Sequence, residues 1–409
     1  MRYVIIGNSA AGIGAVEGIR QIDQQGEITL ITNEPHHTYS RPLISYLLLG
    51  KVTKGSMKYR GSEFYAENRC ALLAGTAVTE LHPAEKRVLL ADGKALPYDK
   101  LLVATGCAPA VPAFEGLETV ERSFTFMSLD DAEALAAALD KQTRVLIIGA
   151  GLIGLKCAEG ILDRVADITV VDLAATILSS ILDEDGAALV QDHLKNKGVR
   201  FKLSCGVRRF EKDTAILENG DKIEFDILVL AAGVRPNTAL LSGIAEIRRG
   251  VVVNAKSETG APDIYAAGDC TQTLDISSGQ NKMMPLLPNA YMQGECAGIN
   301  MAGGTACFDN AIPMNAVGFW GLHIITAGSY SGDEYLQNKS GAYKRLFYSE
   351  NKLNGYILIG DVDGAGIYTS LIREQTPLDS IDFALVCEKP GLMAFAKKDR
   401  IAKLGGDAV

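Results

Sequence analysis

The chain of 409 residues lacks the long apolar run that a membrane-spanning helix needs. Its longest apolar stretches, near residues 227–234 and 324–327, are far shorter than the roughly 18 residues required. An excess of basic side chains is also missing, since 40 lysines and arginines stand against 49 acidic residues and give a net charge of −9. This balance argues against nucleic-acid binding. Residues 1–7 lead directly into a strand-like run without a targeting peptide, so we expect a cytoplasmic protein that does not enter a membrane.

Cysteine pairs are absent as well. The eight cysteines are scattered between residues 70 and 387, with no Cys-x-x-Cys and no ferredoxin-like run. We therefore expect reduced structural thiols, no iron–sulfur cluster and no metal site. Apolar residues make up 47% of the chain, which is enough for a large core, and the length favours two or three domains.

An internal duplication organises the first part of the sequence. Residues 3–12 and 145–154 each combine a β-branched run, a turn of small residues and a helical pattern. A second strand follows each copy and ends at an acid, Glu34 in the first copy and Asp172 in the second. Strand, glycine turn, helix, strand and acid form the βαβ unit of dinucleotide-binding proteins, so the sequence predicts two such sites.

The turn residues suit the chemistry of a pyrophosphate. A diphosphate binds well at a helix N-terminus, where free N–H groups and the helix dipole favour negative charge and only small side chains leave room. The second copy has the full G-x-G-x-x-G spacing, whereas the first has a serine in the middle position. The residues concerned are Gly149, Gly151 and Gly154 in the second copy, and Gly7, Ser9 and Gly12 in the first.

The two acids predict which coenzymes bind. A carboxylate at the end of the second strand accepts hydrogen bonds from ribose hydroxyls and repels a 2′-phosphate. No Arg or Lys follows Asp172 closely, so the second site should prefer NAD(H) to NADP(H).

Three later strands, at residues 98–106, 225–233 and 264–269, run into glycine turns, and a helix is expected from Pro288 to Gly303. From residue 308 the pattern changes to strand-like runs at 315–328, 343–348 and 355–360, followed by a helical stretch at 365–373. The sequence thus predicts an α/β protein with two Rossmann-like nucleotide-binding domains of the three-layer type and a C-terminal α+β domain. The expected boundaries are 1–110 with 240–307, then 111–239, then 308–409.

The paired glycine turns, together with Ala104-Thr105-Gly106, residues 232–236 (AGVRP) and Ala267-Gly268-Asp269, resemble the FAD-dependent pyridine nucleotide-disulfide oxidoreductase superfamily. The resemblance implies that the first copy binds FAD and the second NAD. It implies that Asp269 holds the ribityl region and that the helix from Pro288 points its N-terminus at the flavin. The FAD residues implied are Gly7, Ser9, Gly12, Glu34, Arg41, Pro42, Ala104, Thr105, Gly106, Gly268, Asp269 and Asn289. The NAD residues implied are Gly149, Gly151, Ile153, Gly154, Asp172 and Gly233.

Residues 34–45 are similar to a stretch of rubredoxin and ferredoxin reductases and of the flavin portion of nitrite reductases, in which Arg-Pro lies beside FAD. Residues 39–50 contain no cysteine, which argues against disulfide reduction and cysteine-dependent peroxidase or oxidase chemistry. Two positions depart from many relatives: Lys156 replaces a glutamate and Tyr46 replaces a lysine. Both family positions lie near the reacting rings, so we expect Lys156 and Tyr46 near the flavin and nicotinamide.

The resemblance implies hydride exchange between NAD(H) and FAD, and single-electron exchange with an iron–sulfur or rubredoxin-type protein. The chain would act alone, as a homodimer, or as the flavin subunit of a larger complex that oxidises an aldehyde or a 2-oxoacid. Two alternatives stay open: an NADH oxidase or small-molecule reductase, and an NADH-sensing flavoprotein that acts through partner binding.

Some residues admit a second interpretation. Residues 319–325 suit an interface strand and a core strand equally well. His36 and His37 are expected to be solvated, and Cys107 a small filler. Two basic clusters suit a charged surface or a docking patch for an acidic carrier: Lys51, Lys54, Lys58 and Arg60, and Lys397, Lys398, Arg400 and Lys403.

Overall fold

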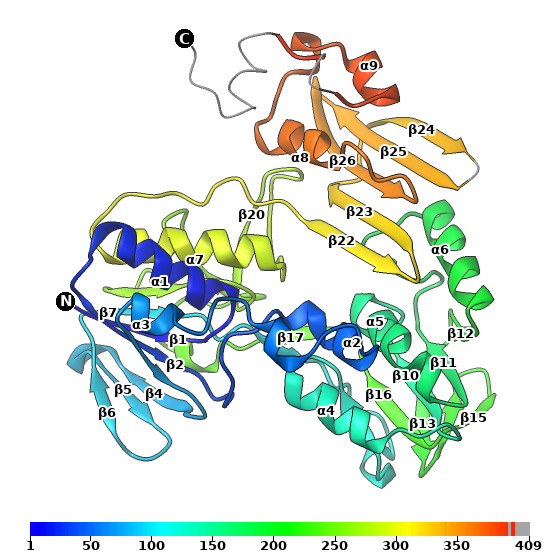
Figure 1. Cartoon of the computed structure of the whole chain (residues 1–409), viewed down its shortest axis with the longest axis horizontal. Coiled ribbons are helices and arrows are strands. Elements are labelled where there is room, and N and C mark those ends of the chain that lie inside the picture. Colours follow the sequence, from blue (N-terminus) through cyan, green and yellow to red (C-terminus); the bar gives the residue numbers. More distant parts are fainter. Residues whose placement is uncertain (340, 392–393, 397–409) are drawn as a thin grey trace. The chain divides into compact units, whose positions relative to one another are not determined.

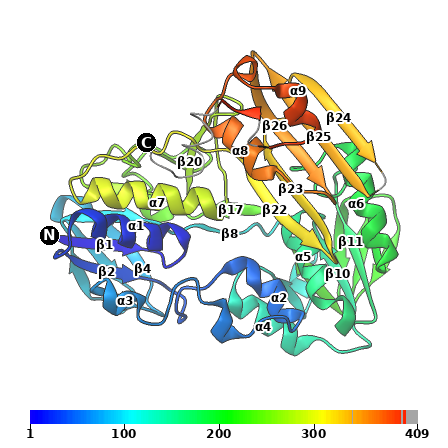
Figure 2. The same ribbon diagram turned by 45° about the horizontal axis from the view of Figure 1, so that its top comes forward.

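The computed structural model describes residues 1–339, 341–391 and 394–396, and Figures 1 and 2 show its elements. The chain forms two compact units. The first comprises residues 1–180, 187–273 and 283–308, and the second comprises 181–186, 274–282 and the residues from 309 onward. The second basic cluster, at Lys397, Lys398, Arg400 and Lys403, lies outside the described residues.

The first unit contains a parallel sheet that we call the first sheet. Its strand order is β19-β7-β1-β2-β3. Side chains alternate between its faces: Tyr3 and Ile5 pack under helices, whereas Val4 and Ile6 pack on a small antiparallel sheet. The elements are β1 (Arg2–Ile6), β2 (Glu27–Ile31), β3 (Cys70–Leu73), β7 (Lys100–Val103) and β19 (Ile264–Ala266), with helices α1 (Ala10–Ile22) and α7 (Leu287–Met301) on one face and β4 (Val78–His82), β5 (Arg87–Leu90) and β6 (Ala95–Pro97) on the other.

A second parallel sheet repeats this plan, with strand order β12-β11-β10-β16-β9. Leu146, Ile148 and Leu230 face a second small antiparallel sheet. The elements are β9 (Ser123–Thr125), α4 (Leu129–Ala138), β10 (Arg144–Ile148), α5 (Leu152–Ile161), β11 (Asp167–Val171), α6 (Glu184–Asn196), β12 (Val199–Lys202), β13 (Val207–Glu211), β14 (Thr214–Leu217), β15 (Lys222–Glu224) and β16 (Ile227–Leu230). The duplication predicted from the sequence is thus confirmed as two three-layer Rossmann-like folds.

The chain passes from the fold of the first parallel sheet to that of the second, and returns beside the outgoing segment. Strand β8 (Cys107–Pro109) pairs antiparallel with β17 (Val234–Pro236), so the outgoing and returning segments lie side by side. Shorter elements complete the unit: α2 (Ile44–Leu48), α3 (Phe64–Glu67) and β18 (Val251–Val252), which pairs with the start of β20 (Thr271–Asp275).

Helices α1 and α7 touch backbone to backbone. A Cβ atom built on Gly294 would lie 2.0 Å from the carbonyl oxygen of Ala11, and one on Gly298 would lie 2.2 Å from that of Ala15. Gly14 on α1 has the same relation to the Tyr291 carbonyl, at 2.4 Å. Because contact positions increase together along both helices, the helices are parallel. Their N-termini therefore lie at the same edge of the first sheet.

The second unit contains an antiparallel sheet of order β22-β23-β26-β25-β24. The run predicted at 315–328 is a hairpin rather than one strand, because Trp320 and Gly321 both adopt positive φ angles, 45° and 88°, and form a tight turn. Phe319 and Ile324 are buried in the core, and His323 is exposed. The elements are β21 (Gln280–Lys282), β22 (Met314–Phe319), β23 (Leu322–Gly328), β24 (Asp333–Lys339), β25 (Ala342–Ser349), β26 (Lys352–Ile359), α8 (Ala365–Arg373) and α9 (Phe383–Glu388).

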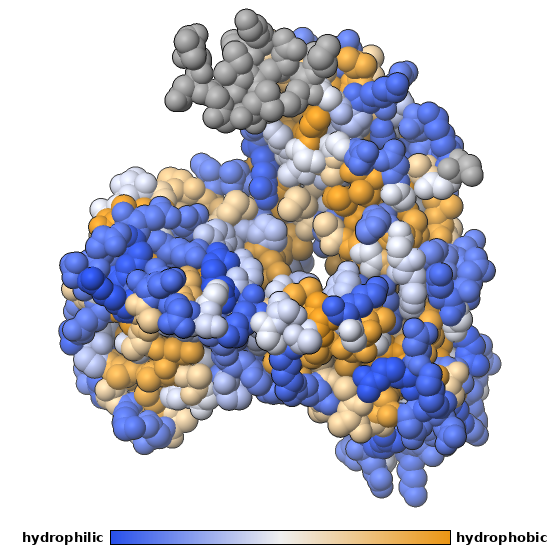
Figure 3. Space-filling model, viewed as in Figure 1, coloured by the Kyte–Doolittle hydropathy of each residue, from blue (hydrophilic) through white to orange (hydrophobic). Residues whose placement is uncertain are grey.

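The hydropathy of the visible surface agrees with the sequence, which lacks long apolar runs. Hydrophilic residues cover much of the face seen in Figure 3, and apolar residues gather there in smaller groups. Within the described part of the chain, every helix is too short or too polar to cross a lipid bilayer.

The glycine contact between α1 and α7 predicts a large penalty for one added methyl group. We expect Gly294→Ala to lower the free energy of unfolding by about 3 kcal/mol, because the backbones must separate to admit the Cβ atom. Urea denaturation checks this. Gly366→Ala in α8 is the matched control, since its Cβ would meet no atom within 4 Å and alanine favours a helix. Equal stability of the two variants would contradict the packing described.

Candidate functional site

The carboxyl ends of five neighbouring parallel strands form one edge of the first sheet. A cleft of about 590 Å³ opens there, a size typical of ligand sites. Nine of the twelve residues predicted for FAD line this cleft: Gly7, Ser9, Glu34, Arg41, Ala104, Thr105, Gly106, Gly268 and Asp269. The other three, Gly12, Pro42 and Asn289, do not line it.

The two glycine turns are built alike. A Cβ on Gly7 would lie 2.1 Å from the Ala104 carbonyl oxygen, and one on Gly149 would lie 2.2 Å from that of Ala231. A Cβ on Gly12 would lie 1.9 Å from the oxygen of Gly7, so Gly12 closes the turn from beneath and does not face the cleft. Gly154 does the same beneath Gly149, at 2.0 Å.

The middle position of each turn has a different role. A Cβ on Gly151 would meet no atom within 4 Å, so the space in front of it is open. Ser9 occupies the corresponding N-cap position of α1 and makes no side-chain capping bond there. A small side chain at this position is therefore compatible with the fold, which explains why serine replaces glycine in the first copy.

Two helices present uncapped N-termini beside the cleft. Neither Ser9 before α1 nor Leu286 before α7 caps its helix through the side chain, and neither first turn contains an acid. Ala10, Ala11, Leu287 and Ala290 of these helices line the cleft. Free N–H groups and positive dipole ends fit a diphosphate and a ring that becomes negative on reduction. These features fit a flavin dinucleotide.

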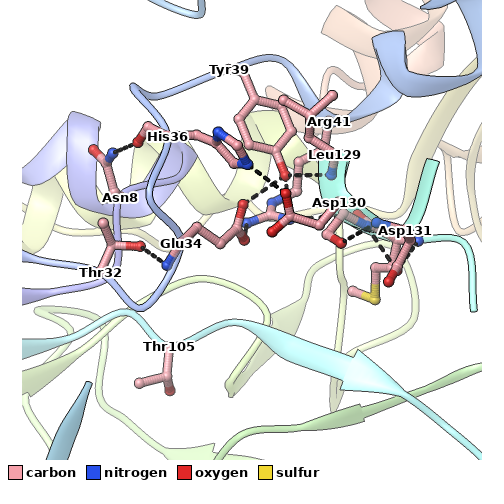
Figure 4. A network of polar contacts seen from close by, with 12 residues as sticks. Asn8, Thr32, Glu34, His36, Tyr39, Arg41, Thr105, Leu129, Asp130 and Asp131 are labelled. Atoms are coloured by element: carbon pink, nitrogen blue, oxygen red, sulfur yellow. Dashed lines mark hydrogen bonds and ion pairs between the residues drawn. The ribbon is translucent and has the colours of Figure 1, made fainter. Parts of the chain in front are cut away.

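A polar network lies at one end of the cleft (Figure 4). The Tyr39 hydroxyl donates to Glu34 Oε2 at 2.7 Å and accepts from the Leu129 N–H at 3.0 Å. Arg41 forms an ion pair with Glu34 and also donates to the Tyr39 hydroxyl at 3.1 Å. His36 pairs with Asp130 at 2.7 Å. The loop that carries Glu34 is thus fixed to the start of α4, and the His36 ring forms a hydrogen bond with Asp130.

Several lining residues were missed from the sequence. They belong to the segment before and within the first turn of α4, namely Thr125, Met127, Ser128 and Asp131, and to other loops, including Asn8 and Asn237. Ser128 and Asp131 form a capping box, and this Ser-x-x-Asp spacing before an apolar pattern was a readable helix-start signal. The sequence pattern does not predict that the start of α4 lies near the first sheet, because this depends on tertiary structure.

Asp269 is a partly buried acid that lines the cleft. Burial raises the pKa of its carboxyl above the ordinary value, whereas Cys107, whose Sγ lies 3.5 Å from Oδ2, and Arg41 act in the opposite sense. Burial also raises the pKa of the Cys107 thiol, so this thiol lacks the thiolate character of a redox cysteine. The structure describes all eight cysteines, and all are free.

The predicted NAD residues lie at the corresponding edge of the second sheet. Asp172 follows β11 and accepts from the amides of Ala150 at 2.6 Å and Ala174 at 2.8 Å, so it also fixes the glycine turn. Gly233 follows β16 with a positive φ of 106°, and Ile153 is the second residue of α5. Together these residues surround the start of α5.

Helix α2 follows the cleft residue Arg41 in the chain and contacts helix α5 of the second sheet. It begins three residues beyond Arg41 and packs against α5, where Gly160 lies close to Ser45 and Leu48. Lys156 Nζ lies 4.6 Å from the centre of the Tyr46 ring and forms an ion pair with Glu159. The two residues predicted to lie near the reacting rings are therefore in contact with each other.

The basic cluster after α2 is partly neutralised. Lys54 pairs with Glu133, Arg60 pairs with Glu17, and Lys58 donates to Ser62. These pairings favour the interpretation as a charged surface. Within the described ranges, no group of three or more His, Cys, Asp or Glu side chains is arranged to hold a metal ion.

The fold and the two glycine turns define a protein that binds two dinucleotides, one beside each parallel sheet. A family model described as pyridine nucleotide-disulphide oxidoreductase matches residues 1–294, and the chain belongs to this family. The protein is an oxidoreductase that uses FAD and NAD(P)H. The sequence predictions of family, enzyme class and coenzymes are confirmed.

Similar proteins give this assignment more detail. The chain is 32% identical to the NADH-dependent phenylglyoxylate dehydrogenase subunit epsilon of Aromatoleum evansii, over 92% of each chain. It is 33% identical to putidaredoxin reductase CamA of Pseudomonas putida, over 71% of each. The chain spans about half the length of two further relatives from Bacillus subtilis (strain 168), 49% and 48%. The covalent putidaredoxin reductase–putidaredoxin complex shares the fold, with a TM-score of 0.87 at 23% identity over 99% of each chain.

The network of Figure 4 predicts a measurable role for one hydroxyl group. We expect Tyr39→Phe to lower the free energy of unfolding by about 1–2 kcal/mol, because the buried Leu129 N–H and the Glu34 carboxylate each lose a partner. Chemical denaturation measures the change. Tyr59→Phe is the control, because its ring packs on Arg60 and its hydroxyl takes part in no hydrogen bond described for this part of the chain. A loss of the same size in both variants would show that the Tyr39 hydroxyl has no special role.

Proposed function

We propose that the protein transfers a hydride between NAD(H) and FAD, and single electrons between FAD and an iron–sulfur or rubredoxin-type protein. The observation that carries the proposal is that α2, which follows Arg41 of the first cleft and packs against α5 of the second site, contains no cysteine. Residues 39–50 contain no thiol, and Tyr46 of α2 meets Lys156 of the NAD-side helix. Sulfur chemistry therefore has no residue on this path.

Bound FAD supplies the chemistry that links a two-electron donor to one-electron acceptors. The chain provides binding and electrostatics. The N–H groups at the start of α1 hold the diphosphate, and Glu34 accepts hydrogen bonds from the ribose. Asp269 holds the ribityl region, and the start of α7 stabilises negative charge on the reduced ring. The remaining residues of the predicted FAD set support these contacts: Gly12 lies beneath the turn, Pro42 follows Arg41, and Asn289 lies in the first turn of α7.

The second site binds the nicotinamide coenzyme. Gly149, Gly151 and Gly154 leave room for the diphosphate at α5, with Ile153 and Gly233 beside it. Asp172 accepts hydrogen bonds from the ribose and disfavours a 2′-phosphate, which makes NAD(H) the preferred coenzyme. We assign residues 1–110 and 240–307 to the FAD domain, 111–239 to the NAD domain and 308–409 to an interface domain. The orders of the two parallel sheets support the first two assignments.

The names of two relatives support a proposal for the physiological partner. One is named as a subunit of an NADH-dependent phenylglyoxylate dehydrogenase, and another as a reductase of putidaredoxin. We propose that this chain likewise serves an electron-carrying protein, as a free reductase or as the flavin subunit of a complex that oxidises a 2-oxoacid. A cytoplasmic location stays a prediction from the sequence.

A comparison of acceptors tests the proposal against the NADH oxidase alternative. With saturating NADH, we expect the FAD-loaded protein to reduce a ferredoxin or a rubredoxin much faster than oxygen, because burial raises the pKa of the Cys107 thiol that lines the cleft and leaves it without thiolate character for oxygen chemistry. Absorbance of the carrier and an oxygen electrode measure the two rates. Faster turnover with oxygen would reject the proposed acceptor. Slow flavin bleaching by NADH, with a long-lived reduced complex, would favour the NADH-sensing alternative.

A further inference from the structure

We propose that Lys156 makes the second site discriminate between the redox states of the nicotinamide ring, because its cation disfavours the positively charged ring of NAD⁺ relative to the neutral ring of NADH. The inference rests on the proposed function and deepens it, since it assigns a specificity-determining residue to the NAD site.

The position of Lys156 along α5 is the first reason. The helix begins at Leu152, so Lys156 is its fifth residue and lies about one turn from the N-terminus. The first turn contains no acid, and the start of a helix already carries partial positive charge. A lysine placed here adds to that charge, and the dipole interaction alone therefore does not favour it.

The side of α5 on which Lys156 lies is the second reason. The acid Asp172 ends β11, so the adenosine half of the coenzyme belongs on the β11 side of β10. The nicotinamide half then extends to the other side, toward β16 and Gly233. Helix α2 contacts both α5 and α4, and α4 follows β9, the neighbour of β16.

Figure 1 shows α2 beside α4 and α5. Because Lys156 Nζ lies 4.6 Å from the ring centre of Tyr46 on α2, the lysine is on the nicotinamide side of α5. The same helix α2 leads back to Arg41 in the FAD cleft, so this is also the side from which a flavin must approach.

Burial and the order of charges are the third reason. The side chain of Lys156 is 15% exposed and that of Glu159 is 5% exposed, so solvent screens this pair little. Glu159 lies three residues farther along α5, which leaves the cation as the member nearer the start of the helix. The pair thus presents its positive end toward the coenzyme. A buried ion pair adds little net stability, which favours a role in recognition.

Lys51 provides a matched control. Its Nζ lies 5.9 Å from the same Tyr46 ring, but it follows α2 on an exposed segment and is not part of α5. Removing Lys51 takes one cation from the same aromatic ring without changing the charge beside the coenzyme.

The test uses calorimetric titration of the FAD-loaded protein with NAD⁺ and with a tetrahydronicotinamide analogue of NADH, whose ring is neutral and cannot donate hydride. We expect Lys156→Gln to strengthen NAD⁺ binding relative to the analogue by roughly tenfold, the size for one unit charge about 10 Å away at an effective dielectric constant of about 20. Lys51→Gln should leave the ratio of the two dissociation constants unchanged.

A double variant guards against misfolding, because Lys156→Gln removes one cation from the buried Glu159 carboxylate. Lys156→Gln with Glu159→Gln removes both charges, and we expect the same direction with a smaller change of roughly threefold. If both nucleotides bind but their affinity ratio stays at the wild-type value in the single and double variants, the inference is wrong while the proposed function stands. If the wild-type protein binds neither nucleotide, the proposed function itself fails.

Discussion

The backbone contact between α1 and α7 is the constraint on which the FAD site depends. Because glycines remove the Cβ atoms between the helices, α1 and α7 pack in parallel at a distance that other residues would not allow. Their N-termini are therefore both held at the edge of the first sheet, where five parallel strands end. Both helix starts lack a side-chain cap, and residues of both line the cleft, which suits a diphosphate and a ring that becomes negative on reduction. The chemistry of the cleft follows from this packing more than from any single side chain.

The two copies of the dinucleotide unit share a backbone but use their acids differently. Asp172 accepts hydrogen bonds from backbone amides of its own turn, whereas Glu34 is held by Arg41 and Tyr39. The first arrangement fixes the glycine turn from within. The second ties the FAD-side loop to α4, which follows the edge strand of the second sheet. The Tyr39 hydroxyl group is thus one of the connections between the two copies.

Local patterns in the sequence predicted both glycine turns, the strand-end acids and the C-terminal helix at 365–373, because each depends on short-range chemistry. The hairpin at Trp320-Gly321 was missed, since a tryptophan with positive φ is not a typical turn signal. The lining residues Thr125 to Asp131 were also missed. These residues line the cleft because α4, which follows the edge strand β9 of the second sheet, begins close to the first sheet. This closeness depends on tertiary structure, so no residue spacing in the sequence predicts it. The sequence predicted that Tyr46 and Lys156 each lie near the flavin and nicotinamide rings, but it did not predict that the two side chains are in contact.

The central claim is that electrons pass between the two coenzymes without a participating thiol. Cys107 is the cysteine that lines the described cleft, so the most direct measurement is anaerobic stopped-flow bleaching of the flavin by NADH in the wild-type protein and in Cys107→Ala. The account predicts rapid bleaching at closely similar rates in both. Loss of bleaching in the variant, with FAD still bound, would contradict it.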